Sequence, residues 1–208
     1  MILSFSGVDS FKFADAFNSM ARARASVFHD RLGWNVNMVN GRELDDYDNH
    51  PDTIYLIEQS QYGEFFGSLR LIPTTGKYML KHEFRNMFPK NFDVSGPGTW
   101  ECTRFCVHPG ASPIESRTVA RKLLHGLCKF ALASDIKKIV GVYGVEMVRI
   151  YRTIGWSPTP ICASKPQFGR LFAGLWTVDD SVLETIESRT VPRQPGAENS
   201  VPSITVHQ

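Results

Sequence analysis

The 208-residue sequence has no long apolar run, no large excess of either charge and no recognisable secretion signal. No stretch reaches the roughly 18 apolar residues that a membrane span needs. The first residues, MILSFS, lack the basic segment and the longer apolar segment of a signal peptide. A net charge of +2 is too small to indicate nucleic-acid binding by itself. We therefore expect a cytoplasmic protein with no membrane span and no nucleic-acid partner.

Cysteine is scarce as well, with four residues at Cys102, Cys106, Cys128 and Cys162. Their spacing matches no CxxC metal motif, and without a secretion signal we expect reduced thiols. The acidic segment 43–48 lacks the alternating ligands and the glycine of a calcium loop. The sequence therefore predicts neither a metal site nor a prosthetic group.

The composition is typical of a globular protein, with 42% hydrophobic and 21% charged residues. The length suits one domain. From about residue 188 the chain contains Pro, Ser and Gly with little apolar content, as disordered tails do. We expect a single domain over residues 1–187 and a flexible C-terminal tail over residues 188–208.

Hydrophobic periodicity predicts an alternation of helices and strands. We expect helices at 11–32, 112–134 and 145–154, a short helix followed by a loop within 84–92, and strands at 53–59, 64–72, 100–107, 136–143 and 170–177. The helix at 112 begins with Ser-Pro-Ile-Glu, a capping box with proline in the first turn. Residues 34–51 have no sustained period and form a long loop. This order predicts an α/β fold, a three-layer α-β-α sandwich with a mixed sheet.

Arg24 lies on an otherwise apolar helical stripe with Phe13, Phe17, Met20 and Phe28, spaced three or four residues apart. Burying an unpaired guanidinium is very costly. Arg24 therefore either snorkels at the helix edge or meets an acidic partner or an anionic ligand. Its place in the middle of the stripe favours a partner.

Carboxylates and further arginines follow downstream. The loop carries four acids, Glu43, Asp45, Asp46 and Asp48. Arg70 lies in an apolar strand, and Glu101 in a later strand is its natural partner. Glu101 and Arg104 would point to opposite faces of a regular strand. We therefore predict a β-bulge between Cys102 and Phe105 that lets both side chains serve one polar site.

The helix 112–134 carries a basic stripe opposite its apolar stripe. Its members are Arg117, Arg121, His125 and Lys129, with Lys122 beside them. Such a stripe is either a solvated helix face or a docking surface for an acidic protein or a phosphate.

Taken together, these residues resemble the LuxI-type autoinducer synthases, the acyl-homoserine lactone synthases of Gram-negative bacteria. The resemblance covers roughly residues 3–180, with the pattern Arg24, Phe28, Trp34, Asp45, Asp48, Arg70, Phe84, Glu101 and Arg104. It implies a fold similar to the GCN5-related acetyltransferases. It also implies an enzyme that acylates the amine of S-adenosylmethionine, usually from acyl carrier protein, and lactonises the product with release of methylthioadenosine.

The resemblance also implies roles for individual residues. The S-adenosylmethionine site would contain Arg24, Phe28, Trp34, Asp45, Asp48 and Arg104, with Asp45 or Asp48 as the partner of Arg24. The catalytic set would be Glu43, Glu101 and Arg70. Either Glu43 or Glu101 would be the base that deprotonates the amine, and the choice between them stays open. A backbone amide near Phe105 would stabilise the thioester oxyanion.

The acyl group would occupy a pocket walled by Phe84, Trp100, Cys102, Leu124, Val142, Tyr143, Met147 and Trp176. Family members that make 3-oxo products carry Thr or Ser near positions 143–144. This sequence has Tyr143 and Gly144, which favours an unsubstituted or other acyl chain. Docking of the acyl carrier protein would involve Arg117, Arg121, Lys122, Lys129 and Arg149. Acyl-CoA stays open as the donor, and we expect a monomer or a weak dimer.

Two other functions compete with this one. An acyl-CoA-dependent N-acyltransferase of the same fold would hold a pyrophosphate in a glycine-rich turn at a helix start. The corresponding turn here, residues 108–113, contains two prolines that cannot donate a hydrogen bond. In a non-catalytic module that binds an acidic partner through the basic helix, the polar network would be purely structural.

Overall fold

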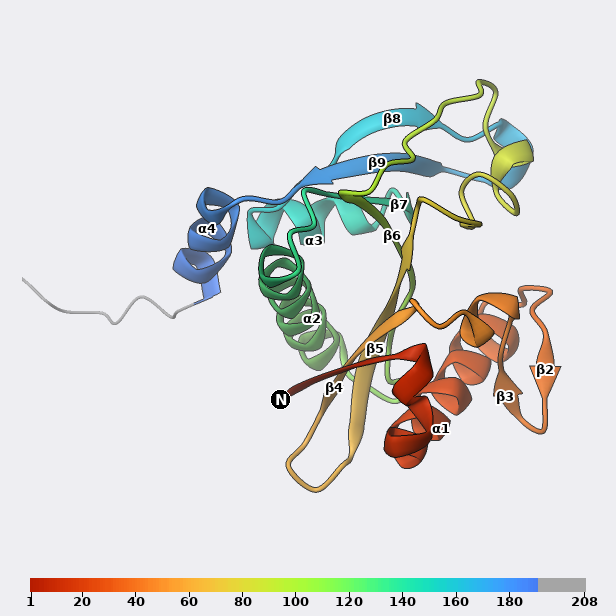
Figure 1. Cartoon of the computed structure of the whole chain (residues 1–208), viewed down its shortest axis with the longest axis vertical. Coiled ribbons are helices and arrows are strands. Elements are labelled where there is room, and N and C mark those ends of the chain that lie inside the picture. Colours follow the sequence, from red (N-terminus) through yellow and green to blue (C-terminus); the bar gives the residue numbers. More distant parts are fainter. Residues whose placement is uncertain (191–208) are drawn as a thin grey trace, which may run out of the picture.

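A seven-stranded sheet forms the centre of the computed structural model, which describes residues 1–190 (Figure 1). Its strands, in spatial order, are β1 (Ile2–Ser6), β4 (Ile54–Gln59), β5 (Phe65–Pro73), β6 (Thr99–Val107), β7 (Lys138–Gly144), β9 (Leu171–Thr177) and β8 (Thr159–Ala163). Neighbouring strands are antiparallel except β6 and β7, which are parallel. The sheet is therefore mixed, as the sequence predicts.

Helices cover both faces of this sheet (Figure 1). On one face lies α1 (Ala14–Arg24), which continues as a π-helical segment, Ala25–Arg31. On the other lie α2 (Pro113–Ala133), α3 (Met147–Ile154) and α4 (Asp180–Thr190). Short 3-10 turns occur at Gly7–Phe13, Asp46–Asn49, Arg85–Met87 and Pro166–Phe168, and a small hairpin joins β2 (Met38–Val39) to β3 (Arg42–Glu43). The three-layer α-β-α architecture is confirmed.

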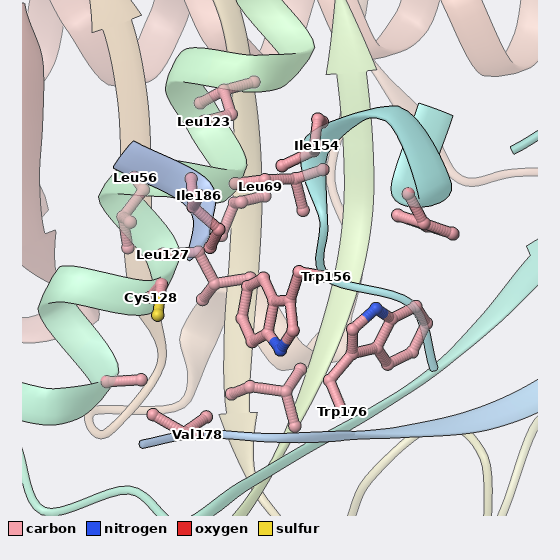
Figure 2. Packing of buried hydrophobic residues seen from close by; sticks show 14 of the residues in the cluster. Leu56, Leu69, Leu123, Leu127, Cys128, Ile154, Trp156, Trp176, Val178 and Ile186 are labelled. Atoms are coloured by element: carbon pink, nitrogen blue, oxygen red, sulfur yellow. The ribbon is translucent and has the colours of Figure 1, made fainter. Parts of the chain in front are cut away.

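The alternation of side chains along β4 and β5 separates two apolar cores. Leu56 and Leu69 face α2 and join the larger core beneath α2, α3 and α4, part of which Figure 2 shows. Tyr55 and Ile57 face α1 and join a smaller core. Arg70 lies on the α1 side of β5, because its neighbour Leu69 faces α2. The polar site therefore forms on the α1 side of the sheet.

Most boundaries of the predicted helices and strands agree with the observed ones within a few residues. The capping box of α2 is present, since Ser112 and Glu115 exchange hydrogen bonds. Gly155 ends α3 with φ +92°, a left-handed conformation that glycine adopts easily. The predicted helix 11–32 instead opens with a 3-10 turn and becomes α-helical at Ala14.

Four strands and one α-helix were not predicted: β1, β2, β3, β8 and α4. Strand β8 contains Pro160, which argues against a strand but is tolerated at this edge of the sheet. Helix α4 covers residues 180–190, so the expected tail begins inside a helix, and residues 191–208 lie outside the described residues.

The parallel strands β6 and β7 pair only near their beginnings. The register joins residues 99–101 of β6 to residues 138–140 of β7 and extends no further. Beyond Glu101 the two strands diverge, and the edge of β6 that faces β7 has no strand partner among residues 1–190. Half-buried apolar side chains follow this divergence, among them Cys102, Phe105 and Met147.

The close approach of α2 to the sheet depends on Gly67. A Cβ at this position would lie 2.7 Å from Val119 Cγ1 and 2.8 Å from the carbonyl oxygen of Cys106. We expect Gly67→Ala to lower the free energy of unfolding by about 1–3 kcal/mol through overpacking, measured by urea denaturation. Gly76→Ala is the control, because nothing lies within 4 Å of its Cβ position. Equal effects of the two substitutions would contradict this account of the packing.

Candidate active site

Three arginines and three carboxylates meet on the α1 side of the sheet and alternate around a closed ring. The members of this charge ring are, in order, Arg24, Glu43, Arg104, Asp45, Arg70 and Asp48. Each arginine binds two of the acids and each acid binds two of the arginines. Ionised, the ring carries no net charge, so each buried charge is compensated by its neighbours.

Arg24 is at the junction of α1 with the π-helical segment and is fully buried. Its Nε donates to Glu43 Oε2 at 2.5 Å, and its two terminal nitrogens donate to the two oxygens of Asp48 at 2.9 Å each. The predicted acidic partner of Arg24 is therefore present. It is Asp48 together with Glu43, and Asp45 makes no bond to Arg24.

Arg70 closes the opposite side of the charge ring and is also fully buried. It donates to Asp45 at 2.6 and 2.9 Å and to Asp48 Oδ1 at 2.9 Å. Its Nε donates to Thr103 Oγ1 on β6 at 3.1 Å. The guanidinium nitrogens of Arg70 thus bind side chains of the acidic loop and of β6, and Arg70 holds the loop onto the sheet.

Arg104 joins the charge ring because β6 is irregular. Opposite Arg70 and Ser68 of β5 the strand β6 carries Thr103 and Cys106, so it contains one extra residue. Arg104 has φ +52°, in the left-handed region, and this bulge turns its side chain to the face that Glu101 and Thr103 share. The predicted bulge is confirmed. Arg104 donates to Glu43 Oε1 and Asp45 Oδ2 at 2.8 Å each.

The three acids come from one short stretch, residues 43–48, and local bonds fix its shape. The side chain of Asp45 accepts from the backbone N–H of Tyr47, and Asp48 accepts from the backbone N–H of Asp45, which forms a capping box. The hydroxyl of Tyr55 on β4 donates to Asp48 at 2.8 Å. The long loop of the sequence is therefore ordered by its own acids as well as by the arginines.

Burial pushes the pKa of Asp48 up, but the charges of Arg24 and Arg70 outweigh it. The pKa of Asp48 is consequently held well below its ordinary 3.8. Asp48 therefore remains ionised at neutral pH and keeps both arginines paired.

The charge ring is open to solvent at one link only. The side chains of Arg104 and Asp45 are 9% and 18% exposed, whereas that of Asp48 is 4% exposed and those of Arg24, Arg70 and Glu43 are 0% exposed. The 2.8 Å bond between Arg104 and Asp45 is thus the most exposed link of the charge ring.

Two aromatic side chains lie beside this link. Phe28 stacks on Trp34 with ring centroids 5.2 Å apart, and the guanidinium carbon of Arg104 lies 5.6 Å from the centre of the Phe28 ring. Phe28 is buried, while Trp34 is 48% exposed. The pair offers an aromatic surface next to the accessible part of the charge ring, which suits a cationic ligand.

Glu101 does not pair with Arg70, contrary to the expectation from the sequence. Its two oxygens accept hydrogen bonds from the backbone N–H groups of Met79 and Leu80, at 2.6 and 2.8 Å. Burial raises the pKa of Glu101 to about 8, although these two amides and the charge of Arg70 act in the opposite direction. The expected pairing was wrong because Asp45 and Asp48 already bind the guanidinium of Arg70. These two acids lie in a loop whose docking position cannot be predicted from local sequence patterns.

Met79, Tyr55 and Thr103 contribute to the site but were not expected from the sequence. The sulfur of Met79 lies 3.4 Å from Arg70 Nη2 and 3.5 Å from Arg104 Nη1, and so links Glu101 to the charge ring. The only available signal was the position of Tyr55 and Thr103 in strands flanking Arg70, because Met79 lies in an irregular segment.

The structure divides the predicted acyl-pocket residues between the two faces of the sheet. Six belong to or pack against the core beneath α2 and α3: Trp100, Cys102, Leu124, Tyr143, Met147 and Trp176. Phe84 and Val142 pack in a separate cluster on the opposite face. Val142 and Tyr143 are adjacent in β7 and must point to opposite sides. The eight residues therefore do not line one pocket here.

The predicted docking residues differ in whether their charges are paired with an acidic side chain. Lys122 is bound to the buried carboxylate of Glu58 at 2.8 Å, so its charge is already paired. Within residues 1–190, Arg117, Arg121, Lys129 and Arg149 make no ion pair. A groove of about 790 Å³ opens beside the start of α2, between that helix, α1 and the beginning of β5.

Over the described chain, no group of three or more His, Cys, Asp or Glu side chains could hold a metal ion. The four cysteines are free thiols. In residues 1–190 no helix is long and apolar enough to cross a membrane.

A mixed sheet that diverges between its parallel strands, with a buried polar site on one face, defines an acyltransferase type of fold. An acyl-CoA N-acyltransferase from Pseudomonas aeruginosa has this fold, with a TM-score of 0.57, 13% identity and coverage of 84% of this chain and 98% of that chain. The chain belongs to the autoinducer synthase family, whose pattern matches residues 10–186.

Individual relatives agree with this assignment. An acyl-homoserine-lactone synthase of Rhizobium etli is 52% identical over 174 residues, which are 83% of this chain and 82% of the relative. The solved structure of BjaI, a CoA-dependent acyl-homoserine lactone synthase with SAM and isopentyl-CoA, has a TM-score of 0.81 and 22% identity. It covers 98% of this chain and 95% of that chain.

The charge ring predicts that neutralising one of its members lowers the stability of the fold. In Asp48→Asn the shape is kept, but Arg24 and Arg70 lose a shared counter-charge inside the protein. We expect the free energy of unfolding to fall by about 3–5 kcal/mol at pH 7, measured by urea denaturation. Because the folded-state pKa of Asp48 is depressed, its contribution is present above pH 3.8 and is lost as the pH falls through the folded pKa.

The control is Asp46→Asn in the same loop, because the side chain of Asp46 is 90% exposed. We expect this change to stay within about 0.5 kcal/mol of the parent. An Asp48→Asn protein as stable as the control would show that the charge ring does not hold the loop.

Proposed function

We propose that the chain makes an N-acyl-L-homoserine lactone, a quorum-sensing signal, from S-adenosyl-L-methionine and an acyl-[acyl carrier protein], and releases methylthioadenosine. The observation that carries this proposal is the single exposed link of the charge ring, Arg104 to Asp45, beside the Phe28–Trp34 pair. The family, the fold and the Rhizobium etli relative support it. S-adenosylmethionine is a substrate here, and no prosthetic group is needed for this chemistry.

The methionyl end of S-adenosylmethionine is a zwitterion, and the exposed link has the complementary charges. Its carboxylate can bind the guanidinium of Arg104 while its ammonium binds the carboxylate of Asp45. This insertion replaces one ion pair with two and leaves no buried charge unpaired. The sulfonium would then lie against Phe28 and Trp34, whose rings attract a cation. Arg24 and Asp48 complete the site by holding Glu43 and the acidic loop in place.

Glu101 is the better of the two candidate bases. Both oxygens of Glu43 bind guanidinium groups of Arg24 and Arg104, whereas Glu101 binds only neutral amides. A base with a pKa of about 8 can take up a proton near neutral pH. Glu101 would receive the proton of the substrate ammonium through water, because its side chain is fully buried. Arg70 would then act by positioning the loop rather than by touching the substrate.

The deprotonated amine attacks the carbonyl carbon of the thioester. A new C–N bond forms, the C–S bond breaks, and the thiol of the donor leaves with a proton. A backbone N–H near Phe105 on the unpaired edge of β6 would stabilise the oxyanion in between. In the second step a methionyl carboxylate oxygen attacks the carbon next to the sulfonium, and methylthioadenosine leaves with the bonding electron pair. That step depends mainly on geometry, because the leaving group is already activated.

The acyl chain would lie where β6 and β7 diverge, against the six predicted wall residues that share the α2 side of the sheet. The half-buried apolar side chains along this divergence suit a fatty acyl chain. Phe84 and Val142 would act from the opposite face by supporting β7 and the segment that carries Met79.

Acyl carrier protein is the donor that the start of α2 favours. A CoA diphosphate needs free N–H groups at a helix start. Here the amides of Ser112 and Glu115 are used within the capping box, and the carboxylate of Glu115 adds a negative charge. The unpaired charges of Arg117, Arg121, Lys129 and Arg149 suit an acidic carrier protein instead. Both the carrier protein and S-adenosylmethionine are available in the cytoplasm, where we place this reaction.

The direct test incubates the purified protein with S-adenosylmethionine and acyl thioesters, and measures methylthioadenosine and the lactone by mass spectrometry. We expect Glu101→Gln to lower kcat by about 10²-fold or more. The rate of the parent protein should rise with pH toward about 8, as Glu101 loses its proton, and the variant should lack this rise. No methylthioadenosine with any thioester would end the proposal.

Glu43→Gln separates the two candidate bases. It breaks bonds to Arg24 and Arg104, so we expect weaker S-adenosylmethionine binding and lower stability. Normal turnover by Glu101→Gln together with loss of kcat in Glu43→Gln would transfer the role of the base to Glu43.

The choice of donor has its own test. We expect the double variant Arg117→Glu/Arg121→Glu to raise KM for acyl-[acyl carrier protein] by about tenfold, through lost charge complementarity, and to leave KM for acyl-CoA unchanged. Lys90→Glu, an exposed charge between β5 and β6, is the control. A parent protein that uses only acyl-CoA would establish CoA as the donor.

A further inference from the structure

The two backbone N–H groups that bind Glu101 belong to residues 77–84, which we call the amide segment. This segment contains no helix and no strand. Met79 and Leu80 donate the two hydrogen bonds to Glu101, and the N–H of Phe84 closes a turn by donating to the carbonyl oxygen of Met79 at 2.9 Å. Because no helix or sheet ladder fixes this segment, contacts of its side chains must hold the two amides in place.

Glu83 lies inside this turn and connects the amide segment to the acidic loop, residues 43–48. The hydroxyl of Tyr47 donates a hydrogen bond to Glu83 Oε2. Tyr47 is buried and lies between Asp45 and Asp48, two members of the charge ring, whereas the side chain of Glu83 is 36% exposed. The Tyr47–Glu83 bond therefore ties the segment that holds the proposed base to the loop that supplies the acids of the charge ring.

Lys77 adds a positive charge beside this bond. Its Nζ lies 3.5 Å from Glu83 Oε1, 4.0 Å from Asp46 Oδ2 and 5.2 Å from the centre of the Tyr47 ring. The side chains of Lys77 and Asp46 are 52% and 90% exposed, so these ion pairs contribute little to stability. The hydrogen bond from Tyr47 is the stronger constraint on Glu83.

The charge of Glu83 also acts on Glu101. Burial is the main cause that raises the pKa of Glu101, and the negative charge of Glu83 raises it further. The amides of Met79 and Leu80 and the charge of Arg70 lower it. Loss of the Glu83 charge should therefore lower the pKa of Glu101, whereas loss of the two amide bonds should raise it.

The other groups around Glu101 do not add a second charge of this kind. The arginines and acids of the charge ring neutralise one another. Burial raises the pKa values of three groups on neighbouring elements, which stay protonated at neutral pH: Tyr47, Tyr78 and Cys102. β7 and β9 contribute the apolar side chains of Val140 and Ala173. Glu83 is thus a carboxylate through which the charge near Glu101 can be changed without altering the charge ring.

We propose that Glu83 is a positioning residue for the reaction, because its bond with the Tyr47 hydroxyl holds the amides of Met79 and Leu80 against Glu101. This inference rests on the proposed function, in which Glu101 is the base. Position and charge are two separable contributions of the same side chain. Loss of the bond lets the amides move away from the carboxylate, and loss of the charge lets Glu101 give up its proton at a lower pH.

Substitutions at two positions separate these contributions. Glu83→Gln removes the charge but keeps an oxygen that accepts from Tyr47. Glu83→Ala removes both the charge and the bond, so its difference from Glu83→Gln isolates the bond. Tyr47→Phe, added to Glu83→Gln, removes the same bond from the other side. The control is Glu184→Gln, an exposed carboxylate on α4, on the opposite face of the sheet.

The measured quantities are kcat and the midpoint of the pH–rate profile. In Glu83→Gln we expect the midpoint to move down by about 0.5 pH units and kcat at the high-pH plateau to stay within about twofold of the parent. In Glu83→Ala we expect a kcat about tenfold lower and a midpoint above that of Glu83→Gln, because the displaced amides stabilise the carboxylate less. Glu83→Gln/Tyr47→Phe should reproduce Glu83→Ala, and Glu184→Gln should match the parent.

A second measurement needs no substrate. The carboxyl carbon of Glu101 can be titrated by NMR in the free protein, with its signal identified by its absence in Glu101→Gln. We expect the same order of midpoints as in the pH–rate profiles, lowest in Glu83→Gln. This readout reports on Glu101 itself, so a general loss of folded protein does not imitate it.

The outcomes distinguish this inference from the function on which it rests. An active parent protein whose Glu83→Gln and Glu83→Ala variants have the same kcat and the same midpoint overturns the positioning role and keeps the synthase activity. The same holds if Glu83→Gln loses as much kcat as Glu83→Ala. A parent protein that makes no lactone from any thioester ends the proposed function and, with it, the role of Glu83 in the reaction, whatever the NMR titration shows.

Discussion

The fold of the site depends on the closed alternation of three arginines with three carboxylates. Each arginine comes from a different part of the scaffold: Arg24 from α1, Arg70 from β5 and Arg104 from the bulge in β6. All three acids come from one short loop. Desolvating six charges is expensive, and it is offset only when every charge meets partners of opposite sign. The charge ring thus places the loop on the sheet and leaves a pair of opposite charges partly exposed at one link, where the proposed function has the zwitterion bind.

Local patterns in the sequence revealed the parts of this arrangement. The apolar stripe around Arg24 indicated a buried guanidinium, and the spacing of Glu101 and Arg104 required the bulge that β6 contains. The alternation of apolar and polar residues, together with turn residues, predicted the central strands. The Ser112 capping box predicted the start of α2. These features depend on neighbours in the chain, which is why periodicity and capping chemistry predict them.

The pairing within the site could not be predicted in the same way. Which acid binds which arginine depends on how residues 43–48 dock, and that follows from long-range contacts. Glu101 was assigned to Arg70, yet it binds the amides of Met79 and Leu80, which belong to an irregular segment without a period. The split of the acyl wall between two faces follows from the register of β7, where Val142 and Tyr143 cannot point the same way.

The closed form of the charge ring also constrains how the protein can evolve. Each arginine and each acid in it has two partners, so a change at one position takes one partner from two others and leaves one charge of the ring uncompensated in the interior. A lineage that replaces one member must therefore change a second one almost at the same time, or pass through a poorly folded intermediate. We therefore expect the six residues to be inherited as a unit, and we expect the apolar side chains beneath α2 and α3, where the acyl chain is proposed to lie, to vary one at a time.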